Sequence, residues 1–412
     1  MPHPSVMSAV IAPKQFELNW IVNKRADLIW FIGGALCGYT MFFLHAGLHL
    51  DMLTIWFLWI MLIDTPHFFG TYSRTYFDKE EWNNRKPLYI GSFAWLLLGP
   101  TCIFISYLLY SQNIVQYKIP FIGFIVFFNM WAYWHVVRQH YGIMSLYKRK
   151  NNDFAGFDRR LDQAILYCGL IAPFIAFVIR HPEARITLGL EANAPAFPAN
   201  FALISFFEKS FWAELSWENY IFMISVFIVT LVSVAFIARQ VQLYVNNQPL
   251  NLPKIFFLIA LIPLYAYICY HPAVFTAPLM VFSAFVTIYH DVQYLAIVWF
   301  YNKNRYHKTG VKKERYGLAI KINKNFLTFM ACAVAMGVIF RLMGCSLELH
   351  PGCGVLVLTS KKVLFGALST KELLASMLLG FSLQHYFLDQ YIWRPGKDKK
   401  LREDLKLQAS LS

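Results

Sequence analysis

The chain has 412 residues, of which 58% are hydrophobic and only 15% charged, and its formal net charge is +14. This composition departs from that of soluble proteins and excludes a large water-soluble domain, so it favours a polytopic membrane protein. The basic excess fits loops that face anionic lipid headgroups, and we expect no nucleic-acid partner.

The chain begins with a hydrophilic segment, residues 1–26, which lacks the pattern of a signal peptide. A single transmembrane helical domain over 27–393 and a basic cytoplasmic tail over 394–412 follow. Ten apolar runs in the domain are each near the roughly 20 residues that cross the hydrocarbon of a bilayer. These runs cover residues 28–49, 52–70, 89–110, 119–141, 163–180, 217–238, 255–271, 274–298, 325–343 and 372–392. The expected fold class is therefore all-α, a polytopic bundle of about ten transmembrane helices.

Lysine and arginine collect in alternate connections between these runs. The connection from Asn302 to Lys324 holds eight of them against a single acidic residue, Glu314. Short basic loops stay in the cytoplasm, so we expect both termini there, in a bacterial cytoplasmic membrane. Cys345 and Cys353 lie in a connection on the opposite side, where either a disulfide or two free thiols would fit.

Five histidines lie inside otherwise apolar runs. They are His67, His135, His140, His290 and His385. Four of them, His67, His140, His290 and His385, precede a basic cluster by 7 to 13 residues. At 1.5 Å per residue this offset places them about 10–20 Å from the cytoplasmic boundary. An ionisable residue inside a membrane is costly and usually marks a working site. The pattern therefore predicts one polar layer near the cytoplasmic face, contributed by several helices.

Three aspartates accompany these histidines. Asp64 and Asp389 lie three or four residues from a histidine and share its helix face, and Asp291 directly follows His290. An aspartate can bind a metal or fix the orientation of an imidazole that does. The mixed nitrogen and oxygen set suits one or two iron ions, or zinc. The predicted ligands and their supports are His67, His135, His140, His290, His385, Asp64, Asp291 and Asp389.

His135 and His140 are separated by about 140° around a regular helix, so both cannot point straight at one ion. We prefer His140 as a ligand, because it lies nearer to the depth of His67 and His385.

Further polar residues surround the predicted layer. Candidate substrate-binding residues are Arg74, Arg138, Tyr294 and Arg394. Arginine can hold a carboxylate or phosphate in two parallel hydrogen bonds. The same arginines would also serve to anchor helices at the level of the lipid phosphates.

The segment His135-Val-Val-Arg-Gln-His140 has the H-x4-H spacing of the first histidine box of integral-membrane desaturases and hydroxylases, and Gln139-His140-Tyr141-Gly142 is similar to a segment of membrane alkane hydroxylases. The resemblance covers this one box; single histidines on other helices stand where the family has its later boxes. It implies a non-haem diiron centre that uses dioxygen on an acyl or alkyl chain.

The favoured function is a metal-dependent oxidoreductase of the oxygenase, hydroxylase or desaturase type. It would act on a hydrophobic, lipid-like substrate from the surrounding membrane lipids, supplied with electrons by a donor protein. A proton- or ion-coupled transporter, using the same histidines and aspartates as a relay, is the alternative. A haem-binding membrane protein is a second alternative.

Overall fold

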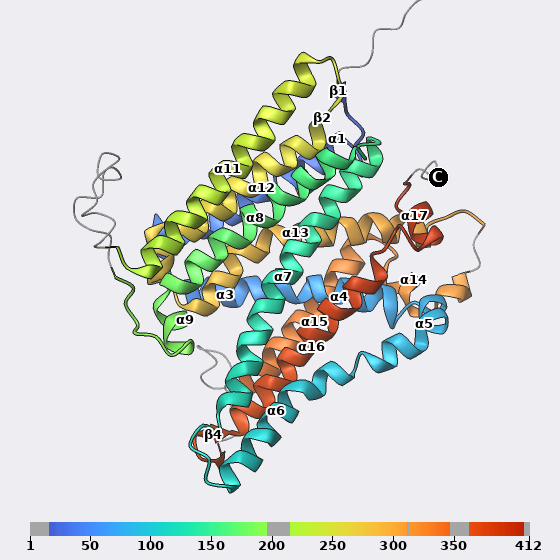
Figure 1. Ribbon diagram of the computed structural model, residues 1–412. Coiled ribbons are helices and arrows are strands. Elements are labelled where there is room, and N and C mark those ends of the chain that lie inside the picture. Colours follow the sequence, from blue (N-terminus) through green and yellow to red (C-terminus); the bar gives the residue numbers. More distant parts are fainter. Residues whose placement is uncertain (1–15, 196–214, 311–312, 347–361, 408–412) are drawn as a thin grey trace, which may run out of the picture.

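The computed structural model describes residues 16–195, 215–310, 313–346 and 362–407, and helices make up most of them (Figure 1). Strand β1 (Phe16–Glu17) pairs in parallel with β2 (Leu250–Asn251), and β3 (Val363–Phe365) pairs with β4 (Leu368–Ser369) in antiparallel. The expected helical class is confirmed. The choice between a disulfide and two free thiols at Cys345 and Cys353 lies outside the described residues, because Cys353 falls in the range 347–361.

Eight helical segments in the described part of the chain are long and apolar enough to cross a membrane. They are α1 (Lys24–Ala26) with η1 (Asp27–Ile32) and α2 (Ala35–Ala46); α3 (Met52–Trp59) with η2 (Ile60–Asp64) and α4 (Thr65–Thr75); α5 (Lys79–Gly91) with α6 (Ala94–Ser111); α7 (Ile119–Lys150); α8 (Gly156–Arg180); α11 (Trp217–Val245); α12 (Leu252–Tyr270); and α13 (Leu279–Tyr306). These apolar helices indicate an integral membrane protein.

Two more helices, α15 (Phe326–Ser346) and α16 (Thr370–Ile392), coincide with the last two predicted runs. The count of ten spans and the cytoplasmic position of the termini stay predictions. Short helices lie between the longer ones: α9 (Pro182–Thr187), η4 (Pro272–Thr276), η5 (Lys313–Tyr316) and α14 (Leu318–Ile322). A further short helix, α17 (Lys399–Asp404), follows α16.

The helices α7 and α13 are longer than the apolar runs that predicted them. The first continues nine residues past the predicted end at 141, to Lys150, and the second continues to Tyr306. Their last turns carry lysine and arginine, which stabilise the negative end of a helix. Hydropathy therefore located the membrane part of each helix but not its polar extension.

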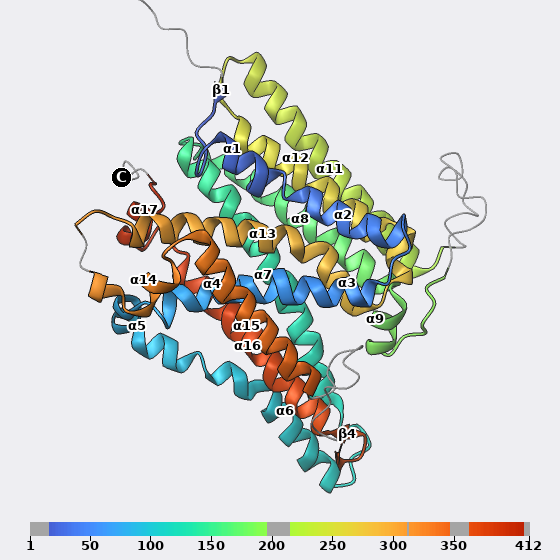
Figure 2. The same ribbon diagram turned by 180° about the vertical axis from the view of Figure 1, so that it is seen from behind.

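Two sets of helices pack around the central helix α13. Helices α2, α8, α11 and α12 contact one another on one side, and α6, α15 and α16 gather on the other (Figures 1 and 2). Helix α7 contacts members of both sets, and α4 lies against α13, α15 and α16. Most residues of α13 are buried, as expected of a helix enclosed by others.

A π-helical segment, η2, leads directly into α4. Such wide turns occur mostly as single insertions inside α-helices and often at functional sites. Helix α15 approaches this segment so closely that a Cβ on Gly337 would lie 2.1 Å from the Met61 carbonyl oxygen. Only glycine allows this contact, which fixes the start of α4 against α15.

Ion pairs join the polar ends of several helices at one end of the bundle, which we call the basic end. Arg305 of α13 pairs with Asp78, at the start of α5, and with Asp404 of α17. The Lys150 ammonium, at the end of α7, donates to the Lys406 carbonyl oxygen. The basic residues that were predicted to share one side thus meet at one end, together with the C-terminal helix.

Candidate metal centre

Four of the five predicted histidines meet inside the bundle, each carried by a different helix. His67 comes from α4, His135 from α7, His290 from α13 and His385 from α16. None of the four residues is more than 5% exposed. The helices that carry them cross near the middle of the molecule (Figure 1). Residues separated by more than 300 positions therefore contribute to one buried polar cluster.

The imidazole nitrogens face one another at short range. The Nε2 atom of His67 lies 3.0 Å from Nε2 of His385 and 3.2 Å from Nε2 of His290. Each nitrogen of a neutral imidazole carries either one proton or one lone pair, so at most one of these two contacts can be a hydrogen bond. Metal bonds of about 2.1 Å would place neighbouring ligand atoms about 3.0–3.4 Å apart. Both nitrogen–nitrogen distances therefore match those expected between two ligands of one metal ion.

Hydrogen bonds around His385 indicate which of its nitrogens carries the proton. The Thr71 hydroxyl donates to Oδ1 of Asp389 at 2.6 Å and lies 2.8 Å from Nδ1 of His385. When the hydroxyl proton of Thr71 goes to the aspartate, the threonine oxygen can accept a proton from Nδ1 of His385. The Nε2 atom of His385 is then left with a free lone pair that points at His67.

The environment of His67 favours the same tautomer. Its Nδ1 atom lies 3.3 Å from Oδ1 of Asp291, and a carboxylate beside a ring nitrogen favours a proton there. The Nε2 atom of His67 would then also present a lone pair, 3.0 Å from that of His385. Two facing lone pairs repel unless a cation lies between them. A cation between His67 and His385 would remove this repulsion.

Both buried aspartates hold one oxygen in place and leave the other without a hydrogen bond. Tyr294 and Thr71 donate to Oδ1 of Asp389, and the Trp59 indole donates to Oδ2 of Asp291 at 3.0 Å. The remaining oxygens, Oδ2 of Asp389 and Oδ1 of Asp291, are buried without a hydrogen-bond partner. A buried carboxylate oxygen in that state is costly, so Oδ2 of Asp389 is suited to a cation, whereas Oδ1 of Asp291 faces Nδ1 of His67 at 3.3 Å.

The unpaired oxygen of Asp389 faces two histidines. It lies 3.8 Å from Nε2 of His385 and 4.0 Å from Nε2 of His135, which is itself buried without a partner. These three residues form one group whose ligand atoms lie within 4.8 Å of one another, and His67, His135 and His290 form a second. The buried histidines and aspartates can therefore hold a metal ion.

The other two predicted ligands occupy different positions. Asp64 forms a third group with His67 and Asp291, whose possible ligand atoms lie within 4.8 Å of one another. His140 belongs to none of these groups: its ring centre lies 6.3 Å from that of His290, and its Nε2 atom bonds the Tyr265 hydroxyl at 2.9 Å.

The structure thus places His135 in the cluster, whereas the sequence had favoured His140. Depth along the helix was a poor guide, because the direction of each side chain around α7 decides which ring enters the cluster. The Tyr265 hydroxyl donates to the Val286 carbonyl oxygen, so His140 joins a structural hydrogen-bond chain.

The predicted substrate-binding residues do not form one group. Arg74 is fully buried, lies between the rings of Tyr301 and Trp393 at 4.1 and 4.0 Å, and donates to the Ile392 carbonyl oxygen. It therefore caps the C-terminal end of α16. Arg138 is exposed and donates to the Tyr167 hydroxyl.

Arg394 is the third arginine of that prediction. It lies 4.4 Å from the centre of the Tyr391 ring and bonds the Gln390 carbonyl oxygen, on the outside of the same helix. Of the four residues, Tyr294 lies closest to the histidines, because its ring centre is 4.7 Å from that of His67.

Sequence reasoning missed three residues of the cluster. Thr71 and Trp59 hold Asp389 and Asp291, and the ring of Tyr386 stacks on His135 with centres 4.5 Å apart. Thr71 lies four residues after His67 and therefore on the same face of α4, which is a signal that helical spacing provides. Trp59 and its partner Asp291 lie on different helices, so spacing along one helix could not have linked them.

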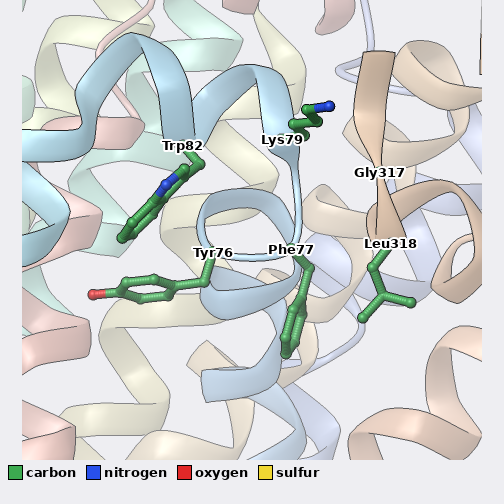
Figure 3. Close-up of a pocket in the computed structure, with 6 residues that line it drawn as sticks. All are labelled: Tyr76, Phe77, Lys79, Trp82, Gly317 and Leu318. Carbon is green, nitrogen blue, oxygen red and sulfur yellow. The ribbon is translucent and has the colours of Figure 1, made fainter. Parts of the chain in front are cut away.

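A hollow of about 410 Å³ lies at the surface, away from the histidines (Figure 3). Tyr76, Phe77, Lys79, Trp82, Gly317 and Leu318 line it. It lies beside the start of α5, at the basic end, and is open to the exterior. It contains none of the predicted site residues.

Comparisons with family models, with curated proteins and with solved structures found no match for this chain.

Proposed function

We propose that this protein is an integral-membrane, metal-dependent oxidoreductase of the oxygenase, hydroxylase or desaturase type. Its substrate would be a hydrophobic, lipid-like molecule that enters from the bilayer. The observation that carries the proposal is the meeting of four buried imidazoles and an unpaired carboxylate oxygen of Asp389 within the membrane part of the bundle.

Iron is the metal that this donor set favours, as one or two ions. Neutral imidazoles with a carboxylate and no thiolate suit iron or zinc rather than copper(I). Two histidines and one carboxylate, as in His135, His385 and Asp389, are the ligand set of many oxygen-activating iron sites, in which further coordination positions stay open. Iron bound there would supply the activation of dioxygen.

The chain contributes position and a dry environment. Thr71, Tyr294 and Trp59 hold the two aspartates, and the packed rings of Phe68 and Tyr386 lie against the histidines. Aromatic walls exclude water, which would otherwise quench reactive species. This environment suits oxidation of a hydrocarbon chain.

A relay of protons would use the same residue types in a different arrangement. Its members would be linked by complete hydrogen bonds, with donors matched to acceptors. Here two carboxylate oxygens and Nε2 of His135 are buried without such partners. The unpaired atoms therefore favour a metal centre over the transporter alternative.

We further propose a bacterial cytoplasmic membrane as the location and an electron-donor protein as a partner. The proposed donor would approach the basic end, where exposed lysines include Lys303 and Lys397. A negatively charged donor would be attracted there over a distance set by the ionic strength.

The experiment is to measure metal content and dioxygen consumption of the purified protein in detergent or nanodiscs, with long-chain lipids as trial substrates. We expect iron to restore dioxygen consumption to chelator-stripped protein, and zinc to bind without restoring it. Uptake of a cation into proteoliposomes, with no metal-dependent consumption of dioxygen, would contradict the proposal and favour transport.

A further inference from the structure

Tyr294 of α13 connects the candidate metal centre to a second aromatic side chain. Its hydroxyl donates to Oδ1 of Asp389 at 2.8 Å and accepts a hydrogen bond from the Trp393 indole at 3.1 Å. Its ring centre lies 4.7 Å from that of His67 and 5.8 Å from that of His385. One phenol therefore contacts the histidines through its ring and the aspartate through its hydroxyl.

Trp393 extends this contact toward the basic end. It directly follows the last residue of α16, is only partly buried, and its ring centre lies 5.9 Å from that of Tyr294 and 5.7 Å from that of Tyr301. Tyr301 lies further along α13, toward Arg305 and the ion pairs of the basic end. Closely spaced aromatic rings thus run from the buried histidines toward the end where the helices terminate.

Tyrosine and tryptophan are the side chains that lose a single electron most readily. Oxidation of a tyrosine also releases its phenolic proton, so a buried redox-active tyrosine needs a proton acceptor. Asp389 supplies that acceptor at hydrogen-bond distance, through the oxygen that does not face the histidines. The hydrogen bond from Trp393 keeps the phenol oriented and links the two rings.

We propose that Tyr294 and Trp393 form the route by which electrons reach the metal centre. The inference rests on the proposed function, because it requires a redox-active metal oxidised by dioxygen. If an oxidised metal ion were bound by these residues, Tyr294 would in the first step supply one electron to it, and the phenolic proton would move to Oδ1 of Asp389. In the second step Trp393 passes one electron to the tyrosyl radical, and the proton returns from Asp389 to the phenol oxygen. A one-electron donor protein at the basic end re-reduces Trp393.

The charge of Arg74 influences which of the two side chains carries the radical. Its guanidinium lies 4.0 Å from the centre of the Trp393 ring, and a cation at that position disfavours positive charge on the indole. Tyr294, by contrast, becomes a neutral radical when its proton moves to Asp389. The observable species is therefore a tyrosyl radical, and Trp393 acts as a short-lived step.

The test uses the full-length protein, loaded with iron, reduced with dithionite, freed of excess reductant and mixed with dioxygen. Samples frozen at successive times are analysed by electron paramagnetic resonance. We expect a transient tyrosyl signal in the wild type and its loss in Tyr294→Phe. In Trp393→Phe the tyrosyl signal should still form. When a one-electron reductant is added, its decay should be several-fold slower than in the wild type. Tyr289→Phe is the matched control, because Tyr289 lies on the same helix and donates to the Phe31 carbonyl oxygen instead.

Metal content separates this inference from the function on which it rests. Wild type that binds iron and consumes dioxygen, with radical formation and decay unchanged in Tyr294→Phe and Trp393→Phe, would overturn the route alone. Wild type that binds no metal, or whose metal does not react with dioxygen, would overturn both. A tyrosyl signal that disappears in Tyr289→Phe but not in Tyr294→Phe would place the redox-active residue elsewhere and also reject the route.

Discussion

Replacing Thr71 by valine removes one hydroxyl of the candidate metal centre without changing the shape of the side chain. That hydroxyl contacts Nδ1 of His385, Oδ1 of Asp389 and the Tyr294 hydroxyl, at 2.8, 2.6 and 2.5 Å. It therefore holds one ligand imidazole in its metal-binding tautomer and fixes the carboxylate at the same time. The change leaves both predicted ligands in the protein but removes the group that orients them.

The expected loss in metal affinity is about 10- to 100-fold, the usual effect of removing a side chain that orients metal ligands. This range corresponds to about 1.4–2.8 kcal/mol of binding free energy. We expect the upper part of the range, because one hydroxyl serves both His385 and Asp389. The protein should remain folded, since valine and threonine have nearly the same volume.

The assay is a titration of iron or zinc into the purified apoprotein in the presence of a competing chelator of known affinity. Thr75→Val is the matched control. Thr75 lies one turn further along α4, is also buried, and donates only to the Thr71 carbonyl oxygen. Equal metal affinities of Thr71→Val and Thr75→Val would refute the reasoning, because they would show that the hydroxyl of Thr71 does not orient a metal ligand.

Three further predictions concern parts of the chain around the centre. His140→Ala should keep the full metal content and lose about 1–3 kcal/mol of stability with its buried hydrogen bond, as measured by metal analysis and thermal unfolding. Gly380→Ala should lower the melting temperature, because its Cβ would lie 2.6 Å from the Leu96 Cα and overpacking costs about 1–3 kcal/mol. Burial raises the pKa of Asp398, but the hydrogen bond from the Leu401 N–H and the charge of Arg85 hold that pKa below its ordinary value. The attachment of α17 should therefore be stable at neutral pH and weaken as the pH falls through this lowered pKa, and Asp398→Asn should speed proteolysis of the tail at pH 7.

Each of these predictions has an outcome that would count against it. Loss of metal from His140→Ala would return that histidine to the ligand set, and an unchanged melting temperature of Gly380→Ala would mean that α6 and α16 can separate without cost. A tail of Asp398→Asn that resists proteolysis as well as wild type would show that other contacts hold α17. Arg85→Gln tests the same attachment from the opposite partner.

The sequence predicted the membrane-helical class and the layer of histidines, since both depend on local patterns. Apolar runs located the helices, although α7 continues nine residues past its predicted end. The spacing from histidine to basic cluster grouped His67 with His385, whose rings meet, but it also included His140, which lies outside the groups of possible ligands. Each signal is carried by a single helix and its ends. Pattern reasoning therefore succeeded where the depth of a residue along its helix was the only information needed.

The features of the site that the sequence did not predict depend on the rotation of each helix about its axis and on contacts between helices. Depth favoured His140, whereas the orientation of α7 turns His135 toward the cluster. Arg74 was a candidate either for holding a substrate or for anchoring a helix, and its guanidinium caps α16, because that helix ends beside it. The indole of Trp59 reaches Asp291 across 232 positions of sequence, and no local pattern encodes such a pair.

X-ray absorption spectroscopy of the purified, metal-loaded protein tests the central claim most directly, because it reports the atoms bound to the metal. We expect nitrogen and oxygen neighbours at about 2.0–2.2 Å with the outer-shell pattern of several imidazoles, and loss of that pattern in His67→Ala and His385→Ala. A metal surrounded by water oxygens alone, or an imidazole signature that survives both substitutions, would contradict the assignment of these helices to a metal centre.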